Sequence, residues 1–255
     1  MESSLKLIEN LSNANGISGF EDEVLDVVKK VVKDKLKIKE DSMRNLYLYP
    51  KKFDQDKPVV MLDSHSDEVG FMVKSINANG TLKFVTIGGW SPQNVPAHKV
   101  RIKNSRGKYI KGVVASKPPH FMDEDEKGKL VKIKEMIIDV GASSKKELIE
   151  KYEIEVEAPI IPDVCFDYDQ ENNIIMGKAF DNRLGTALVV ELMLNANHEK
   201  LPFNLVGSLS AQEEVGTRGA EVTARTIKPD AAIAFEGTPA DDSFRDQDDA
   251  QAVLN

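Results

Sequence analysis

Residues 58–71 of this chain read PVVMLDSHSDEVGF, a nearly continuous apolar run that ends in histidine and carboxylate side chains. An apolar run without polar alternation is typical of a strand that is covered on both faces, as in an α/β sheet. In open α/β sheets, functional residues collect at the carboxyl ends of the strands. The segment therefore predicts an α/β fold and a functional site that begins near His65.

The segments on both sides fit the same kind of sheet. Upstream, apolar residues at helical spacing predict helices within 5–11 and 24–32, and a strand is expected at 45–49. Ser18 and Glu21 have the spacing of a capping box before the second helix. Downstream of residue 162, the pattern predicts an extended segment, a helix and two buried strands, at 174–176, 184–195, 204–209 and 231–235.

The stretch between these two parts has a different character. Residues 70–161 form short alternating segments, with Asn79-Gly80 and Arg106-Gly107 as hairpin turns and a helical piece at 144–151. We therefore expect an α/β domain made of residues 1–69 and 162–255, interrupted by a β-rich insertion at 70–161.

Composition narrows the classes of partner. The chain has 255 residues, and its net charge of −8 opposes binding to nucleic acid or to an anionic membrane. No apolar run approaches the ~18–20 residues that cross a bilayer. The single cysteine, Cys165, has no partner for an intramolecular disulfide. These features predict a cytoplasmic protein.

Acidic or imidazole groups follow predicted strands or precede a predicted helix at four places. Each has an ordinary structural explanation as well: a histidine in the core, a helix N-cap, a solvated loop or a surface turn. Together, however, they supply nitrogen and oxygen ligands, a carboxylate to bridge two ions and a spare carboxylate to act as base. The candidate residues are His65 with Asp67, Asp181, Glu213 with Glu214, and Glu236.

Four motifs containing these residues give the chain a resemblance to a known family. In order, SHSDEVGF, GKAFDNRLG, SAQEEVGTRGA and FEGTPADD resemble the M42 aminopeptidases, the tetrahedral or deblocking group that includes glutamyl aminopeptidases, and ANGISGFEDEV near the start is similar too. The resemblance covers essentially the whole chain. It implies a phosphorylase/hydrolase-like α/β catalytic domain with an inserted small β-rich dimerisation domain, PDZ-like or barrel-shaped.

The resemblance also implies a role for each candidate residue. His65 and Glu236 would hold one divalent ion, Glu214 the other, and Asp181 would bridge them. Asp67 would orient His65, and Glu213 would be the general base. The implied cofactors are two zinc ions, with cobalt or manganese as alternatives. The implied substrates are peptides, cleaved at the N-terminal residue, and the implied assembly is a homo-oligomer, from dimer to dodecamer.

One departure from the family pattern leaves alternatives open. The family takes a further histidine ligand from a C-terminal region, and His98, His120 and His198 do not match that motif. We therefore expect a chain truncated at its C-terminus, with a weak second metal site. Two other functions stay open: an endoglucanase-type glycoside hydrolase, and an inactive assembly subunit. The low aromatic content, 6%, argues against a surface for stacking sugars.

Overall fold

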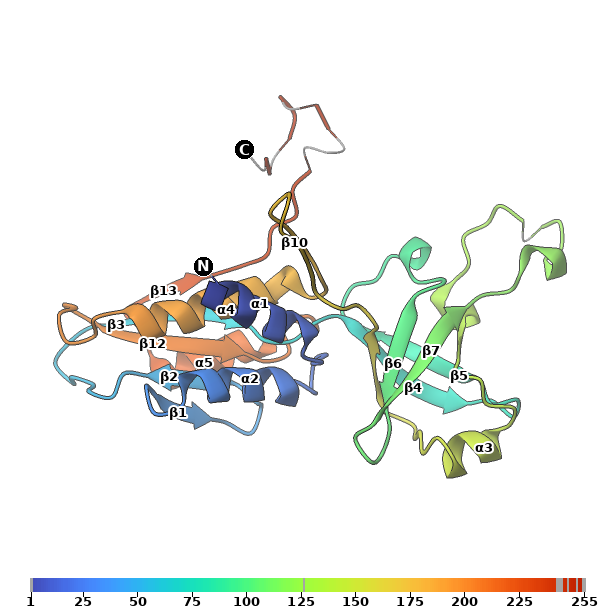
Figure 1. The fold of residues 1–255 in the computed structure, drawn as a ribbon, viewed down its shortest axis with the longest axis horizontal. Coiled ribbons are helices and arrows are strands. Elements are labelled where there is room, and N and C mark those ends of the chain that lie inside the picture. The colour runs from blue at the N-terminus through green and yellow to red at the C-terminus, as the bar shows by residue number, and fades with distance from the viewer. Residues whose placement is uncertain (1, 126, 242–244, 247, 251, 254–255) are drawn as a thin grey trace.

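The chain folds into two lobes that lie side by side, an α/β lobe and a barrel lobe (Figure 1). The computed structural model describes residues 2–125, 127–241, 245–246, 248–250 and 252–253. The barrel lobe comprises residues 70–162, and the α/β lobe is built from the segments before and after it.

A five-stranded sheet forms the centre of the α/β lobe. Its order is β1-β2-β12-β3-β13; the central strands β12 and β3 and the edge strand β13 are mutually parallel, whereas β1 and β2 pair antiparallel. The parallel strands point their carboxyl ends to one edge of the sheet. The strands are β1 (Lys37–Glu40), β2 (Leu46–Tyr49), β3 (Val59–His65), β12 (Asn204–Ser210) and β13 (Ala231–Ala234).

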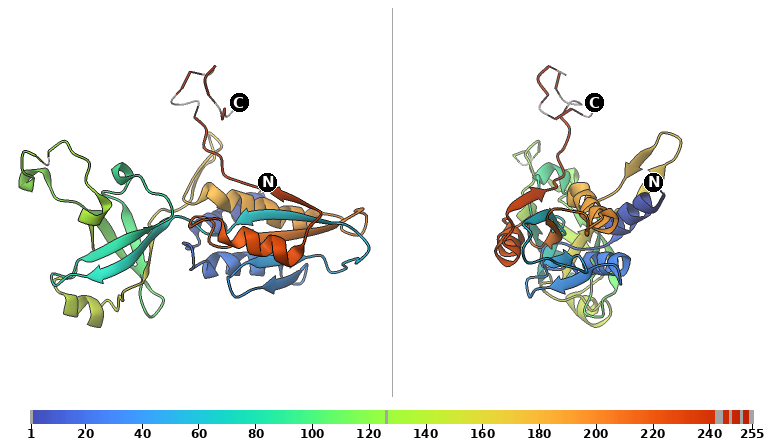
Figure 2. Two further views of the ribbon diagram at one scale, coloured as in Figure 1. Left: turned by 180° about the vertical axis from the view of Figure 1, so that it is seen from behind. Right: turned by 90° about the vertical axis from the view of Figure 1, so that its left-hand side faces the viewer.

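Helices cover both faces of this sheet. The helices α1 (Glu2–Asn13), α2 (Asp22–Val32) and α4 (Phe180–Asn195) lie on one face, and α5 (Arg218–Ile227) lies on the other, as the front and rear views show (Figures 1 and 2). Helix α2 buries Val24, Val28 and Val32, which recur every four residues and so share one side of the helix. The core of the lobe lies between these helices and the sheet.

The barrel lobe has its own core. Six strands close in the order β4-β5-β8-β7-β6-β9, and tight turns at Gly80 (φ +83°) and Gly107 (φ +76°) connect β4 to β5 and β6 to β7. Its strands are β4 (Gly70–Ile76), β5 (Leu82–Ile87), β6 (Lys99–Lys103), β7 (Tyr109–Ala115), β8 (Ile137–Asp139) and β9 (Pro159–Pro162). Short helical elements lie between them: η1 (Pro92–Asn94), η2 (Pro119–Phe121), η3 (Ile133–Glu135) and α3 (Lys145–Glu150).

A small hairpin leads back from the barrel into the α/β lobe. It consists of β10 (Asp167–Asp169) and β11 (Ile174–Met176), and it precedes α4. The predicted fold class, an α/β domain with a β-rich insertion, is confirmed by this arrangement. No helix in the described residues is long and apolar enough to span a membrane.

Two local predictions are wrong. The capping box expected at residues 18–21 does not form, because α2 begins only at Asp22 with Glu21 at the N-cap position and no side-chain cap. Ser18 Oγ donates instead to Asp67 Oδ2 at 2.6 Å. The strand expected to be buried at 231–235 is exposed along all four residues of β13. Among the described residues β13 pairs with β3 alone, at the edge of the sheet, whereas α4 and α5 pack on β3 and β12.

Candidate metal centre

The candidate residues meet where the parallel strands end. His65 closes β3 and is paired in register with Ser210, the last residue of β12, so the loops that follow both strands start side by side. The first loop carries Asp67 and the second carries Glu213 and Glu214. This is the edge at which open α/β sheets place their sites.

Carboxylates surround the His65 ring on its Nε2 side. The Nε2 atom lies 2.9 Å from Asp181 Oδ1, 3.5 Å from Glu236 Oε1 and 3.9 Å from Glu213 Oε2. One donor atom each from His65, Asp181 and Glu214 lie within 4.8 Å of one another. These atoms come from β3, from the start of α4 and from the loop after β12, so three separate elements supply one cluster.

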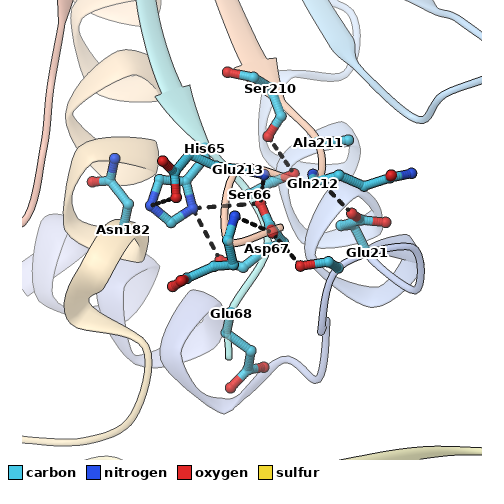
Figure 3. Close-up of polar contacts among 12 residues, drawn as sticks. Glu21, His65, Ser66, Asp67, Glu68, Asn182, Ser210, Ala211, Gln212 and Glu213 are labelled. Atoms are coloured by element: carbon cyan, nitrogen blue, oxygen red, sulfur yellow. Dashed lines mark hydrogen bonds and ion pairs between the residues drawn. The ribbon is translucent and has the colours of Figure 1, made fainter. Parts of the chain in front are cut away.

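Asp67 holds the other side of this cluster together (Figure 3). Its Oδ1 lies 3.4 Å from His65 Nδ1 and accepts the backbone N–H of Glu213 at 2.9 Å. Its Oδ2 accepts the backbone N–H of Glu214 at 3.1 Å and the hydroxyl of Ser18. The fully buried Asp67 carboxylate therefore fixes the start of the Glu213–Glu214 loop and lies beside His65, whose Nδ1 is within hydrogen-bond distance of the Asp67 backbone carbonyl at 3.2 Å.

The crowded charges shift the proton affinities of these groups. Burial alone lowers the pKa of His65, but the carboxylates of Asp67 and its neighbours outweigh burial and raise it to about 9. Burial followed by repulsion from Asp181 and other carboxylates raises the pKa of Glu214 to about 7, although His65 acts in the opposite direction. Burial also raises the pKa of Glu213. For Asp67, hydrogen bonds outweigh burial and lower the pKa.

A second buried network lies directly behind the site. Lys178 Nζ donates to both oxygens of Glu68, at 2.6 and 2.8 Å, and Arg183 contacts Glu68 Oε1 at 3.3 Å. Arg183 also donates to the backbone carbonyl of Leu11 in the last turn of α1 and to those of Ala14 and Gly16 just after the helix. Since Lys178 and Arg183 flank Asp181 in sequence, the network ties the Asp181 segment to the loop after β3.

The six residues singled out from the motifs all lie in this cluster. Glu236 lies outside the mutual group of His65, Asp181 and Glu214, and its side chain is half exposed, as is that of Asp181. It follows β13, and Asn182 Nδ2 fixes the strand's continuation by donating to Phe235 O at 2.7 Å. Asp181 does not act as the N-cap of α4, whose cap residue is Ala179.

Several residues that build the site stand within the quoted motifs, but their roles in the site were not predicted. Ser18, Glu68, Lys178 and Arg183 each contact a partner about 50 or more residues away, which no local pattern encodes. The one available signal was closeness in sequence to a candidate residue: Glu68 is next to Asp67, and Lys178 and Arg183 stand on either side of Asp181. Glu21, expected in a capping box, instead accepts backbone N–H groups from Gly19 at 2.8 Å and Gln212 at 3.3 Å.

The donor set fits a divalent metal ion. One imidazole nitrogen with carboxylate oxygens is a ligand set of zinc and of other divalent first-row metals. Bringing the acidic groups of Asp181, Glu213 and Glu214 to one histidine is costly for the protein alone, because like charges repel in a partly buried site. A cation at the cluster would offset that repulsion.

Comparison with known proteins identifies the family of the chain. A family model for M42 glutamyl aminopeptidase matches residues 45–255. FrvX of Escherichia coli (strain K12) is 36% identical over 239 residues, covering 94% of this chain and 65% of FrvX. The glutamyl aminopeptidase of Lactococcus lactis subsp. cremoris (strain MG1363) is 32% identical, covering 94% of this chain and 68% of its own length.

A solved structure shares both lobes. The TET aminopeptidase from the marine sediment archaeon Thaumarchaeota archaeon SCGC AB-539-E09 superposes with a TM-score of 0.86 at 36% identity, covering 92% of this chain and 65% of that one. The chain thus spans about two thirds of the length of the relatives it matches. With a family match over most of its length and similarity over both lobes, the chain belongs to the M42 glutamyl aminopeptidase family.

Proposed function

We propose that this chain carries the active site of a metal-dependent aminopeptidase that removes N-terminal residues from peptides. The observation that carries the proposal is the convergence of His65, Asp181 and Glu214 at one edge of the sheet, with the free carboxylate of Glu213 beside them. Membership of the M42 family supports the same activity.

The proposed cofactor is a pair of divalent ions. Their ligands would be His65 and Glu236 on one side, Glu214 on the other, and Asp181 between them, with zinc as the first choice and cobalt or manganese as alternatives. When bound, such ions supply Lewis-acid activation of water and of the scissile carbonyl. The close approach of His65, Asp181 and Glu214 also suits a single ion held by all three.

Residues of the chain itself would transfer the proton and hold the catalytic side chains in position. Glu213 would accept a proton from the attacking water and return it to the leaving amine, which is the work of a general base. Asp67 would keep the imidazole of His65 in one orientation, because a carboxylate beside Nδ1 fixes the ring and its tautomer. Through the backbone of Glu213, the same carboxylate would keep the base in place.

The proposed cleavage at the N-terminal residue rests on membership of the M42 aminopeptidase family. The half-exposed carboxylates of Asp181 and Glu236 are proposed metal ligands, so bound ions would offset their charge.

We further propose that the barrel lobe mediates self-association. Apolar side chains are exposed there, including Phe121 at 72% and Leu130 at 52%. Leu130 lines a hollow together with Val131 and with Met122, which follows Phe121 in the chain. Exposed apolar side chains that gather in one place are typical of an interaction surface.

The Glu213→Gln substitution tests the proposed activity. It keeps the size and the backbone hydrogen bonds of residue 213 but removes the base, so hydrolysis of aminoacyl-4-nitroanilides should fall by ~10²–10⁴-fold. Metal content, measured by elemental analysis after dialysis, should stay at the level of the parent. The exposed Glu221, which pairs with Arg225 on α5, provides the matched control as Glu221→Gln.

Two results would contradict the proposal. Glu213→Gln activity within a few-fold of the parent would remove Glu213 from the role of base. The glycoside hydrolase would be favoured instead if the parent cleaved a β-glucan in the presence of EDTA and if adding zinc after EDTA treatment produced no peptidase activity.

A further inference from the structure

A glycine of the barrel lobe lies against the candidate metal centre. Gly88 follows β5 and has a φ of +78°, in the left-handed region that favours glycine. A Cβ atom at this position would lie 2.6 Å from Val69 Cγ1 and 3.3 Å from both Cβ and Oε2 of Glu214. Val69 belongs to the loop after β3, so a side chain at position 88 would meet both loops that carry the site.

The loop that contains Gly88 is fixed to the start of the barrel. Ile87 pairs with Gly70 in the β4–β5 ladder. Trp90 Nε1 donates to Gly70 O at 3.0 Å, and the indole stacks on Phe71 with ring centroids 4.5 Å apart. Because the loop is held on both sides of Gly88, a side chain at position 88 would have to displace Val69, which would lie closest, or shift the loop itself, and it would press on Glu214 at the same time.

We infer that Gly88 is a positioning residue of the metal centre, through which the barrel lobe sets the place of the Glu214 carboxylate. The inference rests on the proposed metal site. Metal–ligand distances tolerate about ±0.2 Å, so a small displacement of one carboxylate is enough to weaken coordination. The insertion is then a part of the site's construction and not only a separate module.

Cation binding by the full chain tests this inference without relying on turnover. After removal of metal by chelator and dialysis, binding of Zn²⁺ and Co²⁺ is measured by isothermal titration calorimetry for the parent and for Gly88→Ala. Supporting contacts of a metal ligand are typically worth ~10–100-fold in affinity, and we expect a loss of this size for Gly88→Ala. Thermal unfolding of each metal-free variant checks that the fold is kept.

Two glycines of the barrel lobe provide matched controls. Gly89 is the next residue of the same loop, and a Cβ there meets no heavy atom within 4 Å. Gly107 has nearly the same backbone strain as Gly88, with a φ of +76°, but its Cβ also meets open space. Gly89→Ala and Gly107→Ala should therefore bind both ions like the parent.

A second variant covers the case in which Gly88→Ala does not fold. Trp90→Phe keeps an aromatic ring against Phe71 but removes the donor to Gly70, so the loop is loosened without any added atom at Gly88. Its cation affinity should fall by about three- to ten-fold, below the effect of the direct contact.

The outcomes separate this inference from the proposed function. Parent-like affinity in both Gly88→Ala and Trp90→Phe would overturn the role of the barrel loop while leaving the metal site in place. An equal loss in Gly107→Ala would assign the effect to backbone strain and would overturn it as well. A parent chain that binds neither ion would overturn the proposed function, and this inference with it.

Discussion

A single carboxylate organises the candidate site. Asp67 accepts two backbone N–H groups from the Glu213–Glu214 loop and one hydroxyl from Ser18, and it lies beside His65 Nδ1. Backbone N–H groups can only donate, so their partner must offer acceptors alone. A carboxylate meets this requirement, whereas an amide of the same shape does not.

The Asp67→Asn substitution should therefore disrupt the site although it conserves shape. In one orientation the new amide NH₂ would face His65 and the backbone N–H of Glu213. In the other it would face Ser18 and the backbone N–H of Glu214. Either way, one buried backbone N–H would lose its acceptor. We expect cation affinity and peptidase activity to fall ~10–100-fold, as measured by calorimetry and by nitroanilide hydrolysis.

A buried aspartate two positions before His65 provides the control. Asp63 accepts hydrogen bonds from the hydroxyls of Ser208 and Ser210. Hydroxyls can reverse and accept from an amide, which backbone N–H groups cannot. Asp63→Asn should therefore keep the cation affinity of the parent, and an equal loss in both variants would refute the specific role of Asp67.

At this scale the motifs predicted which residues gather but not what holds them. The six candidate residues follow strands or precede a helix, so topology alone brings them to one edge. Their supports come from distant segments. Ser18 lies 49 positions from Asp67, and Lys178 lies 110 positions from Glu68. No periodicity in the chain records such pairs.

Among the elements, two short helices show how tertiary contacts override a local pattern. Ser18 and Glu21 have capping-box spacing, yet Ser18 prefers the charged acceptor Asp67 and α2 has no side-chain cap. At α3 a serine does cap the helix: Ser144 Oγ accepts from the backbone N–H of Glu147 at 3.2 Å, and the Glu147 carboxylate accepts from the backbone N–H of Ser143, one residue before the cap. There, no competing carboxylate interrupts the local hydrogen bonds.

The α3 cap makes a pH dependence testable. Hydrogen bonds from the Ser143 N–H and from Lys151 and the Ser143 hydroxyl lower the pKa of Glu147 from 4.5 to about 2. A carboxylate whose pKa is lowered in the folded state stabilises the fold above its unfolded pKa. This contribution is fully present above about pH 4.5 and is lost as the pH falls towards 2.

We expect Glu147→Gln to remove this part of the acid sensitivity. The urea midpoint of the parent should fall more between pH 6 and pH 3 than that of the variant, followed by circular dichroism. Glu150→Gln, on the same helix but 4.0 Å from its nearest lysine partner Lys146, should behave like the parent. An identical pH response in all three chains would show that the Glu147 cap does not contribute.

At the scale of the whole molecule, the sequence predicted each of the two lobes, but it did not predict how the lobes are attached to each other. Each lobe has its own hydrophobic core and its own local signals, namely hairpin turns in one and amphipathic helices in the other. The attachment depends on contacts between the lobes. Glu23 of α2 accepts from the Tyr109 hydroxyl at 2.5 Å and from Lys103 Nζ at 3.3 Å, and Gly88 meets Glu214. These contacts join segments that sequence patterns treat as unrelated.

The exposed apolar side chains of the barrel lobe carry the last prediction, which concerns assembly. Burying one phenylalanine side chain stabilises an interface by ~1.5–3 kcal/mol, and burying an unpaired carboxylate in its place costs more. Since each 1.4 kcal/mol is about tenfold in an equilibrium constant, Phe121→Asp should weaken self-association at least about tenfold. Multi-angle light scattering over a dilution series would show the lower mass.

A substitution of the same kind on the other lobe distinguishes assembly from general solubility. Ile174 is exposed at 58% on the β10–β11 hairpin, so Ile174→Asp adds an equal charge outside the barrel lobe. The proposal requires Ile174→Asp to keep the mass of the parent while Phe121→Asp lowers it. Loss of assembly with unchanged cation affinity would show that the metal centre does not depend on contacts between copies, so that any effect of Gly88 on Glu214 arises within one chain. A parent that is monomeric at every concentration would exclude the barrel surface as an interface between copies.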